Sequence, residues 1–468
     1  MCSQVNFQSI SRADLDTANS QDYAKNFEKG LSEKLVRQIS KDKGEPAWVL
    51  EIRLKALEIF HTKPMPPWGP NLSKLHFDDI RYFSRASDKS NAKSWDEVDP
   101  EIKRTFERLK IPEAERAMLA GVGTQYESEN IYHKLKEEWT EKGVIFEDFD
   151  AALREHPDLV KKYFSKCVPT NDHKFAALHY AVFSGGTFLY IPENTEVTKP
   201  LQAYFRMNSQ NQGQFEHTLI ILEKNSKAHY IEGCSAPKYG SSSLHAGCVE
   251  VFVAEGAEAR YSSVENWSAD TYNLNTKRSI VQKNGRMEWI GGNLGSGTTM
   301  LYPCSLLVGE NSRADHLGVA FANTGQNQDT GAKVIITGQN CRTKIVSKSL
   351  SKGGGTTTYR GLVDVKRSAE NAVVNVECDA LMLDGESVSD TIPSIICDND
   401  TASITHEASA GKISEEVLLY FQSRGITEEN AKGMIVNGFL DEVVKTLPLE
   451  YAVELNRLIE LEMEGSIG

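Results

Sequence analysis

Three residues near the carboxyl end of the sequence carry side chains that could hold iron or an iron–sulfur cluster. Cys378, His406 and Glu407 offer a thiolate, an imidazole and a carboxylate, a reasonable ligand set for a soft metal site. His406 follows Cys378 by 28 residues and Glu407 by 29, so a chain that coils about every 29 residues would stack them on adjacent turns. The alternative is a buried thiol beside an exposed His-Glu pair. Cys397 is the nearest rival thiol, but its 19-residue separation from Cys378 predicts a different part of the coil.

A second column of residues could carry reactive sulfur. Cys234 and Glu265 are 31 residues apart, which is the local repeat length. Cations near a thiol lower its pKa and make it a nucleophile that can carry a persulfide, whereas a neighbouring carboxylate opposes this, so the net direction is not fixed by the sequence. The alternative is an ordinary interior column of a solenoid. The residues in register with this pair are Arg206, Asn208, Trp267 and Lys277.

The charge, the apolar runs and the cysteines of the chain disfavour nucleic-acid binding, a membrane span and a disulfide framework. The 468 residues carry a formal charge of −13, which disfavours general binding to nucleic acid because that requires a basic face. No stretch reaches the roughly 18 apolar residues of a membrane span, and residues 1–20 show no export or organelle signal. We therefore expect a cytoplasmic protein whose eight cysteines are thiols rather than disulfides. These are Cys2, Cys167, Cys234, Cys248, Cys304, Cys341, Cys378 and Cys397.

Similar turns recur along the middle of the chain. Each has a turn former, a small residue and a charged residue, and most are flanked by apolar strands. A repeat of about 29 residues built from strands predicts a solenoid, which we expect to be a right-handed parallel β-helix. The alternative is a β-sandwich. The seven turns begin at Asn194, Asn225, Gly256, Asn284, Asn311, Asn340 and Ser368.

Helical patterns flank this mainly β core. We expect an N-terminal helical region over residues 1–165, a β-helix over 166–410 and a C-terminal helical domain over 411–468. Pro46 precedes one amphipathic helix, and residues 132–146 are predicted to form another. In the C-terminal part, Ser414 and Thr427 are candidate N-caps. An apolar stripe there caps the solenoid or docks a partner, and it consists of Phe439, Leu440, Val443, Val444 and Leu447.

Motifs for nucleotide hydrolysis and common hydrolytic chemistry are missing from the sequence. It has no CxxC pair, no HExxH, no GxxxxGK[ST] and no GxSxG. The glycines of residues 351–361 lack the Lys-Ser/Thr ending of a phosphate loop. Nucleotide hydrolysis by this chain alone is therefore disfavoured.

Several long motifs resemble the SufB branch of the SufB/SufD family of iron–sulfur cluster assembly proteins. They include EGCSAP (232–237), VENW (264–267), QDTGAKVI (328–335), CDALMLDGESVSDTIP (378–393), THEASAGKISEE (405–416) and RGITEENAKGMIVNGF (424–439). The resemblance is densest from about residue 204 onward. It implies a transient iron–sulfur cluster, a SufC-like ATPase that docks on the C-terminal helices, and pairing with a SufD-like paralogue or a second copy. It leaves open whether a reduced flavin takes part.

The resemblance also implies roles for individual residues. Cys378, His406 and Glu407 would form the cluster assembly site. Cys234 would accept sulfur from a cysteine desulfurase system and pass it through the β-helix, and the positions matching this path are Arg206, Asn208, Glu265, Trp267 and Lys277. Some family members have Gln at the position of Glu265 and Glu at the position of Thr405, so no ligand role is carried to Thr405. The alternatives are a SufD-like paralogue without a cluster and a β-helix lyase or hydrolase acting on carbohydrate.

Overall fold

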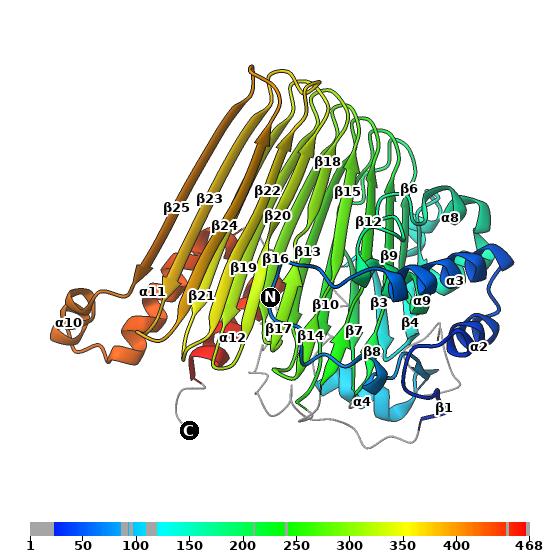
Figure 1. The fold of residues 1–468 in the computed structure, drawn as a ribbon, viewed down its shortest axis with the longest axis horizontal. Coiled ribbons are helices and arrows are strands. Elements are labelled where there is room, and N and C mark those ends of the chain that lie inside the picture. The colour runs from blue at the N-terminus through cyan, green and yellow to red at the C-terminus, as the bar shows by residue number, and fades with distance from the viewer. Residues whose placement is uncertain are drawn as a thin grey trace, which may run out of the picture.

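A computed structural model describes residues 23–85, 92, 97–108, 119–208, 211–238, 242–445 and 449–464. Figure 1 shows long strands stacked side by side into one solenoid, with helices at both chain ends. The solenoid is a parallel β-helix of about eight turns, which confirms the predicted fold class. Only the pairs β1–β2, β3–β4 and β5–β6 are antiparallel among the named strands.

Two sheets form the walls of the β-helix. The first sheet contains β3 (Gly121–Tyr126), β4 (Glu129–Leu135), β7 (Leu201–Arg206), β10 (Lys227–Ser235), β13 (Glu258–Asn266), β16 (Arg286–Leu294), β19 (Arg313–Ala322), β21 (Arg342–Ser351), β23 (Val373–Met382) and β25 (Ser403–Lys412). The second contains β5 (Ile145–Asp148), β6 (Gly186–Ile191), β9 (His217–Leu222), β12 (Cys248–Val253), β15 (Thr276–Val281), β18 (Cys304–Leu307), β20 (Asn327–Ile336), β22 (Thr356–Val365) and β24 (Val388–Cys397). Short strands β8 (Gly213–Gln214), β11 (Ser243–His245), β14 (Thr271–Asn273) and β17 (Thr298–Leu301) extend the second sheet, while β1 (Lys25–Asn26) and β2 (Ser84–Arg85) form a separate pair.

The repeated turns have a common backbone conformation. Asn225 has φ of 55° and Asn340 has φ of 57°, in the left-handed region that asparagine and glycine tolerate best. The side-chain amide of Asn225 donates to Asn194 Oδ1 at 3.0 Å, so neighbouring turns are tied together. In the last of the predicted turns the left-handed residue is Asn371, not a residue of the Ser368 triplet, and its amide donates to Asn340 at 3.1 Å.

Alternation along the strands divides the apolar side chains between the inside and the two outer faces. Residues such as Cys234, Tyr261 and Val376 belong to the core inside the solenoid. The intervening residues of the first sheet, including Ile231 and Ile290, pack outside it in a separate core. Because the side-chain period of a strand is two residues, the pairing register decides which chemistry faces inward.

The N-terminal region mixes helices with strands that join the solenoid. Its helices are α2 (Glu33–Lys43), α3 (Ala47–Thr62), α4 (Pro100–Arg108), α6 (Glu137–Thr140), α7 (Phe149–Glu155), α8 (Pro157–Tyr163) and α9 (Lys174–Val182). The helix after Pro46 is confirmed as α3. The helix predicted over residues 132–146 is wrong: the segment contains the end of β4, short α6 and the start of β5, since Gly143 at φ 79° and pairing with β3 and β6 override its helical periodicity.

The C-terminal helices are α10 (Glu415–Ser423), α11 (Glu428–Val444) and α12 (Leu449–Glu464). Thr427 is confirmed as the N-cap of α11, where its hydroxyl accepts the Asn430 N–H at 3.3 Å. Ser414 occupies the N-cap position of α10 but makes no capping hydrogen bond with its side chain. Leu440 and Val443 of the apolar stripe are buried against the outer face of the first sheet, and Phe439 and Val444 pack at the edge of the same core. The stripe therefore covers the side of the solenoid at its middle coils rather than its end, and Leu447 lies outside the described residues. None of the described helices is both long and apolar enough to cross a membrane.

Candidate functional site

The structure brings Cys378 and His406 together near the carboxyl end of the solenoid. Cys378 lies on β23 and His406 on β25, and Cys378 Sγ is 3.6 Å from His406 Nε2. The register pairs Cys378 with Ala408 and Val376 with His406, so the two side chains are offset by two residues but share the inner face. A sulfur and an aromatic nitrogen at this separation can ligate one metal ion with small movements.

Glu407 does not join this pair. It is paired in register with Glu377, one residue out of phase with Cys378, so strand alternation directs it to the outer face. The one-coil spacing is 30 residues at Cys378, longer than the 28 or 29 on which the expected stacking rested. Thr405 also faces outward, where its hydroxyl accepts from the Asn375 amide at 2.9 Å.

The thiol of Cys378 lies in a sheltered position. Burial raises the pKa of Cys378 to about 12, although a hydrogen bond with Tyr359 works in the opposite direction. The raised pKa keeps this thiol protonated at neutral pH, and a metal ion binding to it would have to displace the proton. Cys397 is exposed, lies on β24 in the other sheet and donates to Asn399 O at 3.3 Å, as its spacing predicted for a thiol away from Cys378.

Cys234 occupies a buried polar cluster inside the solenoid. Its register partner on the next coil is Glu265, as their 31-residue spacing predicted. Lys277 reaches across from β15 in the second sheet, and its Nζ lies 2.7 Å from Glu265 Oε1 and 3.5 Å from Glu232 Oε1. The Cys234 thiol points to Glu232 Oε1 at 3.9 Å. Glu232, Glu265 and Lys277 form one ionic network, and the thiol contacts it through Glu232.

The network continues along the inside of the second sheet. Asn273 Nδ2 donates to Glu265 Oε2 at 2.6 Å, and Asn273 Oδ1 lies 2.9 Å from His245 Nδ1. His245 Nε2 lies 2.5 Å from Glu216 Oε1. Burial alone would lower the pKa of His245, but Glu216 outweighs it and the pKa is raised, which favours the imidazolium.

Burial and the neighbouring carboxylates both disfavour the thiolate form of Cys234. Burial is the largest cause that raises the pKa of this thiol well above its ordinary value, and Glu232, Glu265 and Glu216 add to it, while Lys277 opposes them. Burial also raises the pKa of Glu232, against the attraction of Lys277. The resting thiol is thus protonated, with Glu232 as the nearest acceptor for its proton.

The other residues of the expected path lie around this cluster. Trp267 is in the same inner core, and its ring centroid is 4.2 Å from that of His245. Arg206 pairs with Ser235, one residue out of phase with Cys234, and donates to Ser235 Oγ at 2.9 Å on the outer face of the first sheet. The register therefore separates Arg206 from the thiol that it was expected to activate. Asn208 is buried beyond the end of β7, and its backbone N–H donates to Glu127 at 3.1 Å.

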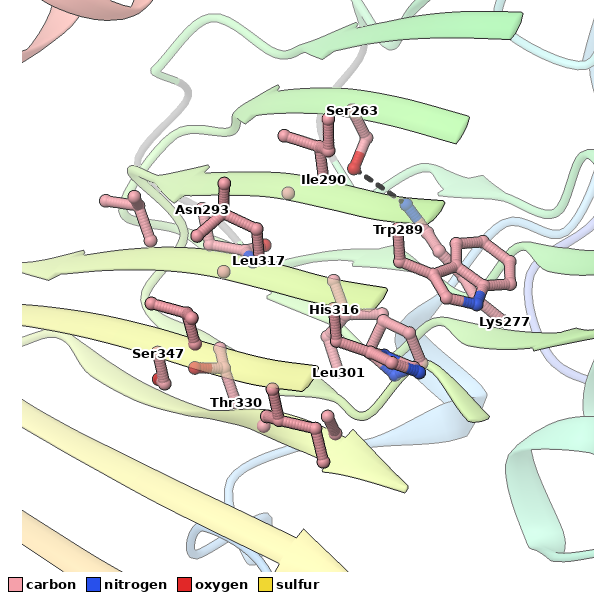
Figure 2. A pocket seen from close by; sticks show the side chains of 18 of the residues that line it. Ser263, Lys277, Trp289, Ile290, Asn293, Leu301, His316, Leu317, Thr330 and Ser347 are labelled. Carbon is pink, nitrogen blue, oxygen red and sulfur yellow. Dashed lines mark hydrogen bonds between the residues drawn. The ribbon is translucent and has the colours of Figure 1, made fainter. Parts of the chain in front are cut away.

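An internal cavity lies between the two thiol sites. It has a volume of about 50 Å³, and its lining runs from Tyr261, Ser263 and Lys277 to Ser347 and Tyr359. Figure 2 shows the hydrogen bond from Lys277 Nζ to Ser263 Oγ, which measures 3.2 Å, at one side of this space. At about 10–15 Å³ for each water, a cavity of this size holds roughly three to five waters.

One register row with small side chains crosses this cavity. Gly291 pairs with Gly318, and a Cβ at Gly318 would meet no atom within 4 Å. We call this row the inner lane; from coil to coil it consists of Glu232, Ser263, Gly291, Gly318, Ser347 and Cys378. The lane connects the acidic cluster at Cys234 with the thiol at Cys378.

Sequence reasoning missed Glu216, Glu232, His245 and Asn273, and it missed the lane. Glu232 follows the inward alternation that contains Cys234, so a two-residue pattern was the available signal. His245 and Asn273 lie on the second sheet, and no repeat spacing relates that sheet to the first. They approach Glu265 only because the two sheets face each other across the interior of the solenoid.

The chain is a parallel β-helix whose candidate chemical groups, an acidic thiol-bearing cluster and a thiol–imidazole pair, lie in its interior and near its carboxyl end. Residues 205–439 match the model "SUF system FeS cluster assembly, SufBD core domain", and residues 94–203 match "SufBD protein N-terminal region". The chain is 55% identical over 441 residues to iron–sulfur cluster assembly SufBD family proteins of Staphylococcus aureus and Staphylococcus haemolyticus, covering 94% of this chain and 95% of each relative.

The chain therefore belongs to the SufBD family of iron–sulfur cluster assembly proteins. This membership confirms the coarser part of the resemblance and favours iron–sulfur cluster assembly over the carbohydrate-active alternative. These relatives are named only as SufBD family proteins, so their names do not distinguish a SufB-type from a SufD-type member.

Proposed function

We propose that this chain is a SufB-type scaffold on which a transient iron–sulfur cluster is assembled. The observation that carries the proposal is the pair Cys378 and His406, whose ligand atoms are 3.6 Å apart beside the last coil of the solenoid. One thiolate and one imidazole leave coordination positions open, and a site that must release its product needs labile ligands. Glu407 would join as a ligand only if its strand moved or if it acted from the outer face.

The last coil favours a second β-helix subunit as the source of the missing ligands. β24 and β25 each pair with only one neighbour among the described strands, so both leave a backbone edge open. Exposed apolar side chains accompany these edges: Ile392 is 44% exposed, and Ile395 and Ile396 are each 46% exposed. A SufD-like paralogue or a second copy of the chain would cover them and bring its own residues to Cys378.

Sulfur would enter at Cys234. The thiol proton passes to Glu232, and the thiolate attacks the outer sulfur of a persulfide donor, such as a cysteine desulfurase system, whose own thiolate leaves. Lys277 supports the transient thiolate, because it contacts both Glu232 and Glu265 beside Cys234 and works to lower the pKa of the thiol. The product is a Cys234 persulfide.

Direct exchange between Cys234 and Cys378 is prevented by distance. The two strands are separated by five pairings, from β10 through β13, β16, β19 and β21 to β23, which at about 4.8 Å each amount to about 24 Å. Sulfur would therefore travel along the inner lane as hydrosulfide. Its release from the persulfide consumes two electrons and one proton and restores the Cys234 thiol, and a reduced flavin in the complex would supply the electrons.

ATP hydrolysis is assigned to a partner, so the chain acts as a scaffold and not as an enzyme. A SufC-like ATPase would dock on α10 and the start of α11 rather than on the buried stripe of α11. Leu419 is 63% exposed, Tyr420 58% and Met434 53%, and together with Val417 they form an apolar surface. The proposed setting is the cytoplasm, where thiols stay reduced.

Anaerobic reconstitution tests the central proposal. Purified Cys378→Ser protein should accumulate no iron–sulfur chromophore with ferrous iron and a persulfide donor, while retaining its folded circular dichroism spectrum. Cys341→Ser is the matched control, because Cys341 is also buried but lies in a turn, 3.2 Å from Ser312 Oγ. An undiminished chromophore in Cys378→Ser would refute the scaffold site and favour a SufD-like role.

A further inference from the structure

A buried cluster outside the solenoid interior joins the N-terminal helices to the second sheet. It consists of His179 on α9, His217 on β9 and Cys248 on β12, and these side chains are 1%, 0% and 0% exposed. One ligand atom from each lies within 4.8 Å of the other two. His217 and Cys248 are direct register partners on the outward face of their strands, so this cluster is separate from the inner lane.

Hydrogen bonding fixes which ring nitrogen of His179 carries the proton. His179 Nδ1 lies 2.9 Å from Ala246 O, and a carbonyl oxygen only accepts, so Nδ1 is the protonated nitrogen. The lone pair of His179 therefore lies on Nε2. This atom is 3.0 Å from His217 Nδ1.

The carboxylate of Glu250 lies behind the other ring nitrogen of His217. Glu250 accepts the backbone N–H groups of Ser165, Cys167 and Val168 at 2.8, 2.7 and 2.8 Å, so both its oxygens are acceptors. His217 Nε2 lies 3.3 Å from Glu250 Oε2, although no hydrogen bond joins them. With the proton on Nδ1, His217 donates to His179 Nε2 and turns the lone pair of its own Nε2 toward the carboxylate. With the proton on Nε2, that proton faces the carboxylate, and two lone pairs face each other across 3.0 Å.

Such a pair repels unless a cation lies between its members. In a tetrahedral zinc site the bond lengths of about 2.0 Å to nitrogen and 2.3 Å to sulfur place two nitrogens about 3.3 Å apart and a nitrogen and a sulfur about 3.5 Å apart. The 3.0 Å separation is close to the first of these distances. A carbonyl or carboxylate behind each ligating imidazole is the usual outer arrangement of protein metal sites.

The surroundings of the cluster are aromatic. The rings of Phe149 and Phe164 lie 4.5 and 4.8 Å from the ring of His217, centroid to centroid. The Tyr180 hydroxyl is 3.9 Å from Cys248 Sγ and donates to Val168 O at 2.7 Å. Its oxygen is a candidate for the fourth ligand position.

We propose that His179 Nε2, His217 Nδ1 and the thiolate of Cys248 bind one tetrahedral divalent cation of the zinc class. Nitrogen and sulfur donors select Zn²⁺ over Mg²⁺ and Ca²⁺, which prefer oxygen. The cation clamps α9 onto the first coils of the solenoid and replaces the Cys248 thiol proton. This site is independent of the proposed assembly function, and its test does not depend on that function.

Metal analysis of the full untagged chain tests the site. The Cys378→Ser protein serves as the parent, because it lacks the candidate assembly thiol. After incubation with Zn²⁺ and gel filtration, the parent should retain one Zn²⁺ per chain, and further replacement Cys248→Ser should remove it. Cys304→Ser is the matched control, since Cys304 is also a buried free thiol at the second sheet, and it should retain the metal.

Cobalt loading keeps the proposal falsifiable if Cys248→Ser does not fold. The parent with Co²⁺ should show the intense visible bands of a tetrahedral ion and a thiolate-to-cobalt charge-transfer band. A folded parent that binds neither Zn²⁺ nor Co²⁺, and whose nitrogen NMR shows His217 protonated on both ring nitrogens, would overturn the inference in favour of a proton between the rings. Retention of the charge-transfer band in folded Cys248→Ser would also overturn it.

Discussion

Filling the inner lane at Gly318 should separate sulfur acceptance from cluster assembly. Gly318 lies in the middle of β19, its backbone is outside the left-handed region, and an added Cβ meets no atom within 4 Å. Gly318→Val would therefore seat its side chain in the cavity of about 50 Å³ without a backbone clash. The valine would occupy the space through which sulfur is proposed to pass.

The stability of this variant follows from two opposing effects. Replacing glycine in a strand stabilises the fold by about 0.5–1 kcal/mol, mainly through the unfolded chain. Displaced water would leave His316 Nδ1 and Asn293 Oδ1, which line the cavity and have no other hydrogen-bond partner among the described residues, without a donor or acceptor. That loss costs about 1–3 kcal/mol for each of the two groups, or about 2–6 kcal/mol together. The net change is a loss of about 1–5.5 kcal/mol, to be compared with the roughly 5–15 kcal/mol that holds a typical domain folded.

The assay supplies sulfur by two routes. With a persulfide donor, Gly318→Val should load Cys234 normally, as read by mass spectrometry, but assemble the chromophore at Cys378 at least tenfold more slowly. With free sulfide from solution the same variant should assemble it at the wild-type rate, because the end of the solenoid is open. Gly411→Val is the control, since Gly411 also lies in a strand with no atom within 4 Å of an added Cβ. Wild-type assembly from the persulfide donor in Gly318→Val would refute the lane.

Three further predictions concern the acidic cluster and the helical surface. Glu232→Gln removes the proton acceptor and should slow persulfide formation on Cys234 by about 10²-fold or more, read by mass spectrometry. Lys277→Met leaves buried carboxylates unpaired and should cost about 3–5 kcal/mol in urea unfolding at pH 7. Burial would raise the pKa of Glu265, but Lys277 outweighs it and the folded pKa lies below the ordinary value of about 4.3. The stability that the Lys277–Glu265 pair contributes is therefore present above about pH 4.3, and it should vanish as the pH falls through the lower pKa of the folded state. Leu419→Glu should weaken copurification of the ATPase about tenfold to hundredfold.

Matched variants decide whether these effects are specific. Lys283→Met breaks an exposed ion pair with Glu310 and should cost much less stability than Lys277→Met, because water screens exposed charges. An equal loss from the two variants would contradict the buried network. Glu258→Gln replaces an exposed acid on β13 and should leave persulfide formation unchanged. Val373→Glu changes an exposed apolar residue at the start of β23, away from α10, and should leave ATPase binding intact. If it weakens binding as much as Leu419→Glu does, the docking surface lies elsewhere.

The sequence predicted contacts along one wall of the solenoid better than contacts across it. The turn repeat identified coils of nearly constant length, and Cys234 and Glu265 are register partners as a result. At Cys378 the coil is one or two residues longer, and a single residue decides the face, so Glu407 points outward while His406 still reaches the thiol. Lys277 approaches Glu265 from the other wall, and no periodic spacing encodes that approach.

The apolar stripe of α11 shows a different limit of sequence reasoning. Amphipathic periodicity shows that Leu440 and Val443 need to be covered, but it does not identify what covers them. The outer face of the first sheet is itself apolar, and the helix satisfies it within the same chain. Removal of residues after Gly411 would therefore expose both surfaces, and such a truncated solenoid is expected to aggregate.

The left-handed turns also set the phase of the solenoid interior. Coil lengths vary, yet each left-handed residue precedes its member of the inner lane by the same seven residues, from Asn225 to Glu232, Asn311 to Gly318 and Asn371 to Cys378. Length differences are thus absorbed after the lane, in the part of each coil that returns through the second sheet. A solenoid built in this way can lengthen or shorten its coils and still keep the inner lane in register. A single insertion between Asn311 and Gly318 would instead turn Leu317 inward, into the lane.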